Sequence, residues 1–292
     1  MDMRGATDGR PTDGPRDCGA FFLDVVRQFT PEELAVRWTD RPRGTNDEIE
    51  RLIEDAWHKA ELNAEANDRT LFDAPICRLV EYSVRGRRLH LTLGATTYRE
   101  FVGTNCAHAD LWCRFGPEVL ANPLGVSAAV VTTDGYILLT RRSERVYAYP
   151  GRIHPVAGTI RLAPDSTGPP DPVAAVIEEI HEELGLPADA LGPIACVGLV
   201  RGKRLVQPDL IFEVPVATDV ESLRTAAAAA SGADENDRLE PILNESGAVV
   251  AYLDAYCEQM TPVASATLLL HGQRHWGTGW FTAARGYLHR VL

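Results

Sequence analysis

Residues 171–186, DPVAAVIEEIHEELGL, constrain the fold of this chain more than any other stretch. Asp171 followed by Pro172 is a good helix start, and Gly185 is a good left-handed helix end. Apolar residues recur at helical spacing on one face: Val173, Val176, Ile177, Ile180 and Leu184. Acidic residues gather on the other face: Glu178, Glu179, Glu182 and Glu183. The pattern predicts one well-delimited helix with an apolar side for a core and an acidic side.

The acidic face is costly for an isolated helix. Glu179 and Glu183 are four residues apart, and like charges at that spacing destabilise a helix by roughly 0.2–0.5 kcal/mol per pair. The helix dipole disfavours negative charge near the C-terminal end, and no Lys or Arg occurs between Leu162 and Val200. A solvated face is the ordinary explanation for such a pattern. The alternative is a divalent cation, which takes oxygen ligands of this kind.

Composition and charge narrow the class of protein. The chain has 292 residues, of which 45% are hydrophobic, enough for one large domain or two modest ones. The net charge of −12 argues against a nucleic-acid partner, which would require a basic surface. The six cysteines show neither zinc spacing nor paired motifs, so we expect reduced thiols and a cytoplasmic protein. No apolar run is long enough to span a membrane.

The first part of the chain is expected to combine helices and strands. Residues 1–19 are rich in Gly, Pro and Asp, which is typical of a disordered tail without a signal peptide. Residues 20–29 form either a strand or a short helix, and Thr30 with Pro31 resembles a helix start. Further elements are expected as a helix at 47–66, a hairpin from 76–84 and 88–94, a polar binding loop at 96–105, and a helix at 108–121.

A second pattern of elements begins near residue 122. Two strands flank the turn Asp134-Gly135, and a short strand covers 156–161 before the acidic helix. Later elements are expected as strands at 194–200 and 210–216, an undetermined region at 226–240, a helix at 247–258 and a further segment at 262–271. Strands and helices alternate without strict βαβ order, so the pattern favours a mixed sheet between helices.

The acidic helix resembles the second half of the Nudix box, E-U-x-E-E-x-G-U, where U is a bulky aliphatic residue. The matching residues are Glu179, Ile180, Glu182, Glu183, Gly185 and Leu186. The resemblance implies an α+β fold, with a Nudix-type α/β/α sandwich around a mixed sheet. It also implies that Glu179, Glu182 and Glu183 hold Mg²⁺ or Mn²⁺, which would bridge a pyrophosphate and activate water.

The first half of the box departs from the family pattern. The arginine position holds Glu178, and the first glutamate position, counted back from Gly185, holds Pro170. Gly158 is the best candidate for the box glycine, which requires an insertion within residues 161–171. These departures leave the three metal ligands in place, but they also suit a Nudix fold that has lost catalysis.

A second resemblance covers about residues 71–215. The segments LFDAPICRL, LTLGATTYREFVGTN, NPLGVSAAV and LLTRRS resemble the animal branch of the Nudix family that hydrolyses UDP-glucose and UDP-galactose. That branch also has a box with an insertion and no arginine. The resemblance implies a magnesium-dependent reaction that yields UMP and a sugar 1-phosphate. Together with the composition of the tail and the change of pattern near residue 122, it suggests domains at 1–19 (tail), 20–121 (an N-terminal α+β part that shapes the substrate site) and 122–292 (the Nudix domain).

Several residues outside the helix are candidates for the substrate site. Arg141 and Arg142 end a predicted strand, and adjacent strand residues point to opposite faces. We therefore expect at most one of them to reach a phosphate, while the other forms a salt bridge. Asp209 opens a later strand, where it either completes the metal site, acts as a base, or has no role.

The predicted binding loop offers a second group of candidates: Tyr98, Arg99, Thr104 and Asn105. They either contact the uracil or sugar, with Tyr98 stacking, or pack the two parts of the chain together. We expect a small-molecule nucleotide sugar as the partner, no nucleic acid or membrane, and a monomer or homodimer. The rival functions are ADP-ribose or dinucleotide polyphosphate hydrolysis, and binding of a nucleotide sugar without turnover.

Overall fold

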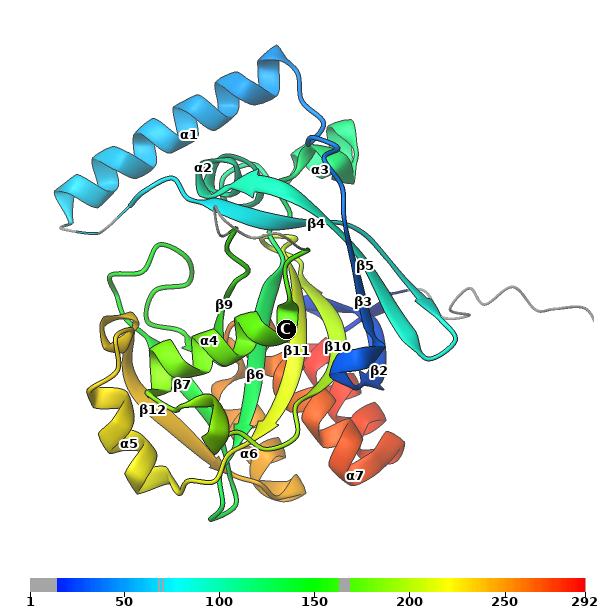
Figure 1. Cartoon of the computed structure of the whole chain (residues 1–292), viewed down its shortest axis with the longest axis vertical. Helices are drawn as coiled ribbons and strands as arrows, with labels where there is room; N and C mark the ends of the chain where they lie inside the picture. The colour runs from blue at the N-terminus through cyan, green and yellow to red at the C-terminus, as the bar shows by residue number, and fades with distance from the viewer. Residues whose placement is uncertain (1–14, 68, 70, 163–168, 292) are drawn as a thin grey trace, which may run out of the picture.

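A large mixed sheet with helices on both faces forms the body of the protein (Figure 1). The computed structural model describes residues 15–67, 69, 71–162 and 169–291. The sheet has the strand order β1-β2-β10-β11-β6-β7-β12, with β8 beside β7 and β9 beside β6. Its strands are β1 (Arg16–Asp17), β2 (Phe21–Phe29), β6 (Gly125–Val131), β7 (Tyr136–Arg142), β8 (Ile153–His154), β9 (Val156–Thr159), β10 (Ala195–Gly202), β11 (Pro208–Pro215) and β12 (Asn236–Leu243).

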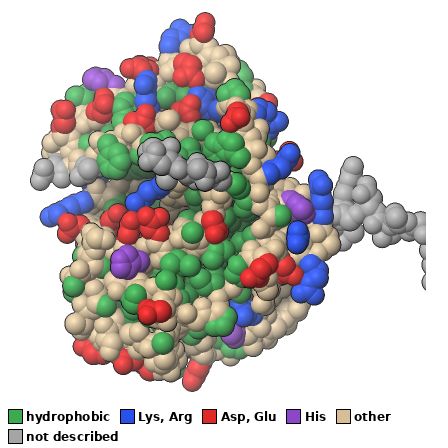
Figure 2. All heavy atoms as spheres, in the orientation of Figure 1, with side chains coloured by type: hydrophobic (Ala, Val, Ile, Leu, Met, Phe, Trp, Pro, Cys, Tyr) green, Lys and Arg blue, Asp and Glu red, His purple; other side chains and the backbone are tan. Residues whose placement is uncertain are grey.

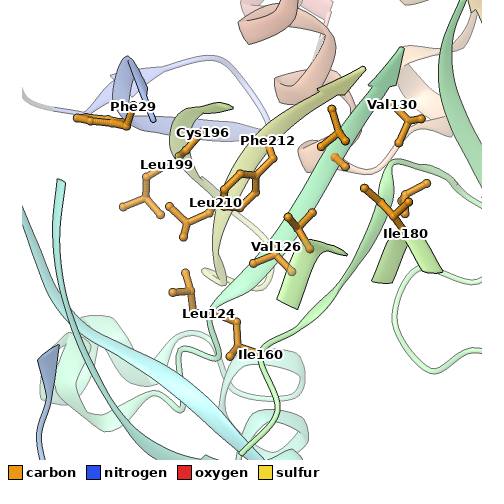
Figure 3. Close-up of a cluster of buried hydrophobic side chains, with 14 of the residues drawn as sticks. Phe29, Leu124, Val126, Val130, Ile160, Ile180, Cys196, Leu199, Leu210 and Phe212 are labelled. Atoms are coloured by element: carbon orange, nitrogen blue, oxygen red, sulfur yellow. The ribbon is translucent and has the colours of Figure 1, made fainter. Parts of the chain in front are cut away.

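The two faces of this sheet carry separate hydrophobic cores. Helix α4 (Pro172–Leu184) packs its apolar stripe against one face, where Ile180 meets strand residues such as Val126 and Leu210 (Figure 3). Helix α7 (Pro262–Val291) covers the other face, where Leu269 joins the core that contains Ile211. Alternation along each strand sends neighbouring residues to opposite cores. The α/β/α sandwich predicted from the sequence is therefore confirmed.

A smaller three-stranded sheet lies above the large one (Figure 1). It contains β3 (Leu34–Trp38), β5 (Arg88–Thr97) and β4 (Pro75–Arg85), and helix α1 (Asp47–Ala66) belongs to the same part of the chain. The predicted hairpin and the predicted helix at 47–66 are confirmed. After Thr30 only a single 3-10 turn forms, at Pro31–Glu33, because β3 starts at the next residue.

The predicted binding loop at 96–105 is wrong, because this segment is helical. It forms α2 (Tyr98–Phe101) and a π-helical turn at Val102–Cys106. Thr97 and Glu100 form a reciprocal capping box that starts α2. A Cβ on Gly103 would lie 2.7 Å from the Cα of Ile53, so this glycine lets the turn pack directly on α1. The predicted helix at 108–121 shortens to α3 (Leu111–Phe115) and a 3-10 turn at Pro117–Val119.

The predicted boundary at residue 121 does not separate the two sheets. Strand β2 pairs with β10 in the large sheet, although it precedes the small sheet in the chain. Part of the predicted tail is also ordered, since β1 pairs with β2. Residues 1–14 of that tail, and residues 163–168 of the predicted insertion, lie outside the described residues.

The C-terminal region contains more regular structure than the sequence indicated. The undetermined region holds part of α5 (Val220–Ala228) and the start of β12, and the predicted helix at 247–258 appears as α6 (Ser246–Tyr256). The segment predicted at 262–271 is the first third of α7, which continues past a kink at Gly277. In the described part of the chain, no helix combines the length and the apolar character that crossing a bilayer requires.

Candidate active site

Helix α4 is built as the sequence predicted. The Asp171 carboxylate accepts a hydrogen bond of 2.8 Å from the Val173 N–H, and Gly185 adopts a left-handed φ of 68°. Val176, Ile180 and Leu184 are fully buried in the core. Because the apolar stripe is fixed against the sheet, the acidic side of the helix is held next to strand β9.

Two of the helix acids are buried against β9 rather than solvated. Glu183 accepts a hydrogen bond of 3.1 Å from the Ala157 N–H and one of 2.8 Å from the Asn236 side-chain amide. A Cβ on Gly158 would lie 1.9 Å from Glu179 Oε1, so only glycine leaves room for this carboxylate. Gly158 therefore contacts the acidic helix, which is the position expected for the glycine of the motif.

Burial raises the affinity of both carboxyl groups for protons. It raises the pKa of Glu179 to about 7, against the opposing effect of Arg161, and Glu182 and Glu235 add to the rise. Burial likewise raises the pKa of Glu183 to about 8, against the hydrogen bond from Ala157. Their mutual repulsion and poor solvation both disfavour the ionised forms, so protons or a cation would stabilise the pair.

One cation does reach the acids, which corrects the expectation that none is near. Arg161 lies one residue before the stretch without bases, and its guanidinium forms two hydrogen bonds to Glu182, of 3.1 and 2.6 Å. The same guanidinium is 3.8 Å from Glu179. The Arg161 side chain remains 56% exposed, so the pair lies at the solvent edge of the site.

The two neighbouring arginines of β7 divide as expected for adjacent strand residues. Arg141 forms a salt bridge of 2.9 Å to Glu240 on β12 and also donates to the Gly151 carbonyl. Arg142 donates to the Ala148 carbonyl at 3.1 Å. Burial lowers the pKa of Arg142, and the charges of Glu183 and Glu235 act against that change. Arg142 is therefore the arginine that faces the helix acids.

The four candidates from the predicted loop separate into three environments. Tyr98 packs edge-on against Phe101, and burial raises its pKa while the charge of Arg142 opposes the rise. Tyr98 is thus within electrostatic reach of the site. The Arg99 side chain instead forms an ion pair with Glu54 of α1.

Thr104 and Asn105 are fully buried and join the two parts of the chain. The side-chain N–H of Asn105 donates a hydrogen bond of 2.8 Å to the Leu205 carbonyl. The side-chain oxygen of Asn105 accepts one of 3.0 Å from the Asn122 N–H. The Thr104 hydroxyl accepts from the Ala121 N–H at 3.0 Å. With 0% exposure both side chains pack the two parts of the chain together, which favours the packing alternative over substrate contact.

Asp209 lies on the other face of the sheet from the helix acids. Asp209 pairs with Gly125, whereas Gly158 pairs with Val126, so alternation sends the Asp209 and Glu179 side chains to opposite sides. The missing Cβ of Gly125 leaves space that Asp209 Oδ2 occupies, 2.3 Å from where that Cβ would be. This placement favours the alternative in which Asp209 has no role in the site.

The acids lie beside a hollow between α4 and the N-terminal part. Figure 2 shows acidic side chains gathered over α4, with basic side chains next to them. Residues that the sequence did not single out take part in this site: Arg161, Glu235 and Asn236. Glu235 and Asn236 come from a region without a clear pattern. Arg161, adjacent to the box region, was recognisable as the nearest upstream base.

Comparison with known proteins supports the family suggested by the motif, although no family model matches the chain. The chain is 33% identical to uridine diphosphate glucose pyrophosphatase of Homo sapiens, covering 46% of this chain and 52% of that protein. This chain is similar to Nudix proteins over about half of its length. It is also 26% identical to Nudix hydrolase 9 of Arabidopsis thaliana, covering 52% of this chain and 57% of that protein.

The likeness to these Nudix proteins is partial. The chain spans about half the length of the curated relatives that it matches. Among solved structures, the MutT protein from Methanosarcina mazei shares 17% identity with a TM-score of 0.37, covering 52% of this chain and 94% of the other. A likeness that distant supports no statement about activity.

Proposed function

We propose that this protein is a Mg²⁺-dependent pyrophosphatase that hydrolyses a nucleotide sugar. The proposed substrate is UDP-glucose or UDP-galactose, and the products are UMP and a sugar 1-phosphate. The observation that carries the proposal is the buried pair Glu179 and Glu183 beside Gly158, with Glu182 at the solvent edge. The likeness to uridine diphosphate glucose pyrophosphatase supports the choice of substrate.

The residues present fit a divalent cation. Burial disfavours the ionised forms of Glu179 and Glu183, a divalent cation would favour those forms, and carboxylate oxygens are the ligands that Mg²⁺ prefers. Glu179, Glu182 and Glu183 would hold it. When bound, Mg²⁺ would neutralise diphosphate charge and lower the pKa of a bound water.

The chain's own side chains can hold the rest of the substrate. Arg142 is fixed by the Ala148 carbonyl and faces the acids, so its guanidinium is available for phosphate oxygens. Tyr98 is within electrostatic reach of Arg142 and offers an aromatic face for the base. We assign phosphate positioning to Arg142 and base stacking to Tyr98.

One observation favours a second candidate, a module that binds nucleotide sugars without cleaving them. Arg161 already neutralises part of the acid cluster through Glu182 and Glu179. If this pairing replaced the metal, the site would bind an anionic ligand and leave it intact. Because the Arg161 side chain is largely exposed, we expect it to move aside when a divalent cation binds.

The experiment that separates these functions is incubation of the chain with UDP-glucose and Mg²⁺, followed by mass identification of the products. Hydrolysis to UMP and glucose 1-phosphate supports the proposal, and heavy-oxygen water identifies the attacked phosphorus. ADP-ribose and dinucleotide polyphosphates in parallel reactions test the other Nudix activities. Stabilisation by UDP-glucose without any product would instead establish a binding module, since ligand at 100 times its Kd adds about 2.7 kcal/mol.

A further inference from the structure

A second group of potential metal ligands lies on the opposite face of the sheet from the acidic helix. It consists of Glu213 on β11 and His271 and His275 on α7, whose ligand atoms all lie within 4.8 Å of one another. The two histidines are one helical turn apart, so both rings face the strand from the same side of α7. Glu213 and His271 are buried, and His275 is exposed at the edge.

The contacts within this group place imidazole nitrogens directly against a carboxylate. His271 Nδ1 lies 2.7 Å from Glu213 Oε2, and His271 Nε2 lies 2.8 Å from Asn244 Oδ1. A neutral imidazole carries one proton, so it can donate to only one of these two oxygens.

If the His271 Nε2–H donates to Asn244, the Nδ1 lone pair points at a carboxylate oxygen. His275 Nε2 faces the same carboxylate, 2.9 Å from Oε2 and 3.0 Å from Oε1. A metal ion placed between the two imidazole nitrogens and the carboxylate would take a lone pair from each of them. A ligand histidine whose second nitrogen is held by a side-chain oxygen is also the usual arrangement at protein metal sites.

We propose that Glu213, His271 and His275 form a transition-metal site, for which Zn²⁺ is the best candidate. Imidazole nitrogen suits Zn²⁺ and similar ions, whereas Mg²⁺ prefers oxygen, so this site and the helix acids differ in the ion that they select. Two histidines and one carboxylate leave a fourth position, which the exposed edge at His275 opens to solvent. The site does not depend on the proposed pyrophosphatase function.

The geometry needs little rearrangement. Ligand atoms about 2.1 Å from a tetrahedral zinc are roughly 3.3 Å apart, so the present contacts must lengthen by about half an ångström. Arg274 also contacts the carboxylate, at 3.1 Å, but it does so through Oε1, and its side chain is 32% exposed. The bound ion would cross-link helix α7 to the central strand β11.

Zinc retention by the full chain tests the proposal. Chelator-treated protein is dialysed against Zn²⁺ with a large excess of Mg²⁺, and bound zinc is measured by elemental analysis. We expect about one zinc per chain, and an affinity that falls at least about tenfold in His275→Gln. Asn244→Ala keeps all three ligands and should weaken binding by about 10- to 100-fold. His289→Gln, on the same helix, is the matched control and should bind as the wild type does.

Two further measurements keep the result interpretable. Co²⁺ in place of Zn²⁺ should give the visible absorption of a four-coordinate ion, and His275→Gln should lose it. The double variant Glu179→Gln, Glu183→Gln should retain zinc, because those acids lie on the other face. Absence of zinc from the wild type, or equal zinc binding by His275→Gln, overturns the proposal and leaves a hydrogen-bonded charge cluster.

Discussion

At the scale of single residues, the candidate site depends on a glycine as much as on its acids. Gly158 has no side chain in the space that Glu179 occupies, so the carboxylate can lie directly on β9. The sequence pointed to this glycine only through the motif. The close approach itself depends on how α4 packs on the sheet, which no local pattern encodes.

Gly158→Ala tests that close approach. The added methyl group would fall 1.9 Å from Glu179 Oε1, so the carboxylate must move away from its place beside Glu183. A displacement of about 1 Å in a catalytic group can cost about 100-fold in rate, and we expect a loss of that order in turnover of UDP-glucose. Gly247→Ala, where a Cβ meets nothing within 4 Å, is the control. Unchanged turnover in Gly158→Ala would contradict the assigned role of Glu179.

Asp209→Asn should change how stability depends on pH. Burial raises the pKa of Asp209 to about 7, partly offset by Ser127, so ionising this group costs folding free energy. Its contribution to stability is complete below its unfolded pKa, near 4, and is lost as pH rises towards 7. Asparagine does not ionise. The free energy of unfolding of Asp209→Asn, relative to that of the wild type, should therefore rise by up to about 1.4 kcal/mol per pH unit between about pH 4 and pH 7.

Urea unfolding at pH 4, 6 and 8 measures this difference between the two proteins. The exposed Asp55→Asn change on α1 is the control, and its offset from wild type should stay constant across the three pH values. A constant offset for Asp209→Asn as well would mean that folding does not change the pKa of Asp209, which contradicts the raised value.

At the scale of elements, the sequence predicted what local chemistry determines. The start and end of α4, the hairpin of β4 and β5, and the turn between β6 and β7 all follow from capping residues, glycines and alternation. The helical segment at Tyr98–Cys106 was missed because its capping box and the packing of Gly103 on α1 outweigh a polar composition. The contact between Arg161 and the acids was missed because Arg161 lies outside the helix, and no local pattern indicates which helix residues it reaches.

The end of α4 can be tested separately from its chemistry. Gly185 has a left-handed φ of 68°, and a Cβ there would lie 2.9 Å from the Ala226 carbonyl oxygen. Gly185→Ala should therefore lower the free energy of unfolding by about 1–2 kcal/mol. The comparison is Gly279→Ala in α7, where a Cβ meets nothing within 4 Å. Equal stabilities for the two variants in urea unfolding would show that the helix end does not depend on this conformation.

At the scale of the whole molecule, two parts that follow one another in the chain are interwoven in space. Strand β2 from the first part completes the large sheet, while Asn105 and Thr104 bond the small-sheet region to residues near 121 and 205. The sequence could not predict this arrangement, because pairing of β2 with β10 joins residues far apart in the chain. The expected boundary at 121 followed a change in pattern, and the sheet does not follow that change.

Asn105→Ala tests whether this junction stabilises the molecule. The change removes a donor to the Leu205 carbonyl and an acceptor for the Asn122 N–H in a fully buried place. Leaving such groups unpaired costs about 1–3 kcal/mol each, so we expect a clear fall in Tm. Turnover well below that Tm should stay near the wild-type value, because Asn105 does not face the hollow. Lost turnover in a folded Asn105→Ala protein would return Asn105 to the substrate site.

The central claim is that the buried acids of α4 hold the cation that hydrolysis requires. Glutamine at position 183 keeps the shape of the side chain but removes its charge, so the fold should survive. The decisive measurement is the rate at which wild type and Glu183→Gln convert UDP-glucose to UMP in the presence of Mg²⁺. We predict magnesium-dependent turnover by the wild type and a loss of roughly two to four orders of magnitude in the variant. Equal turnover by the two proteins, or none by the wild type, would contradict the claim.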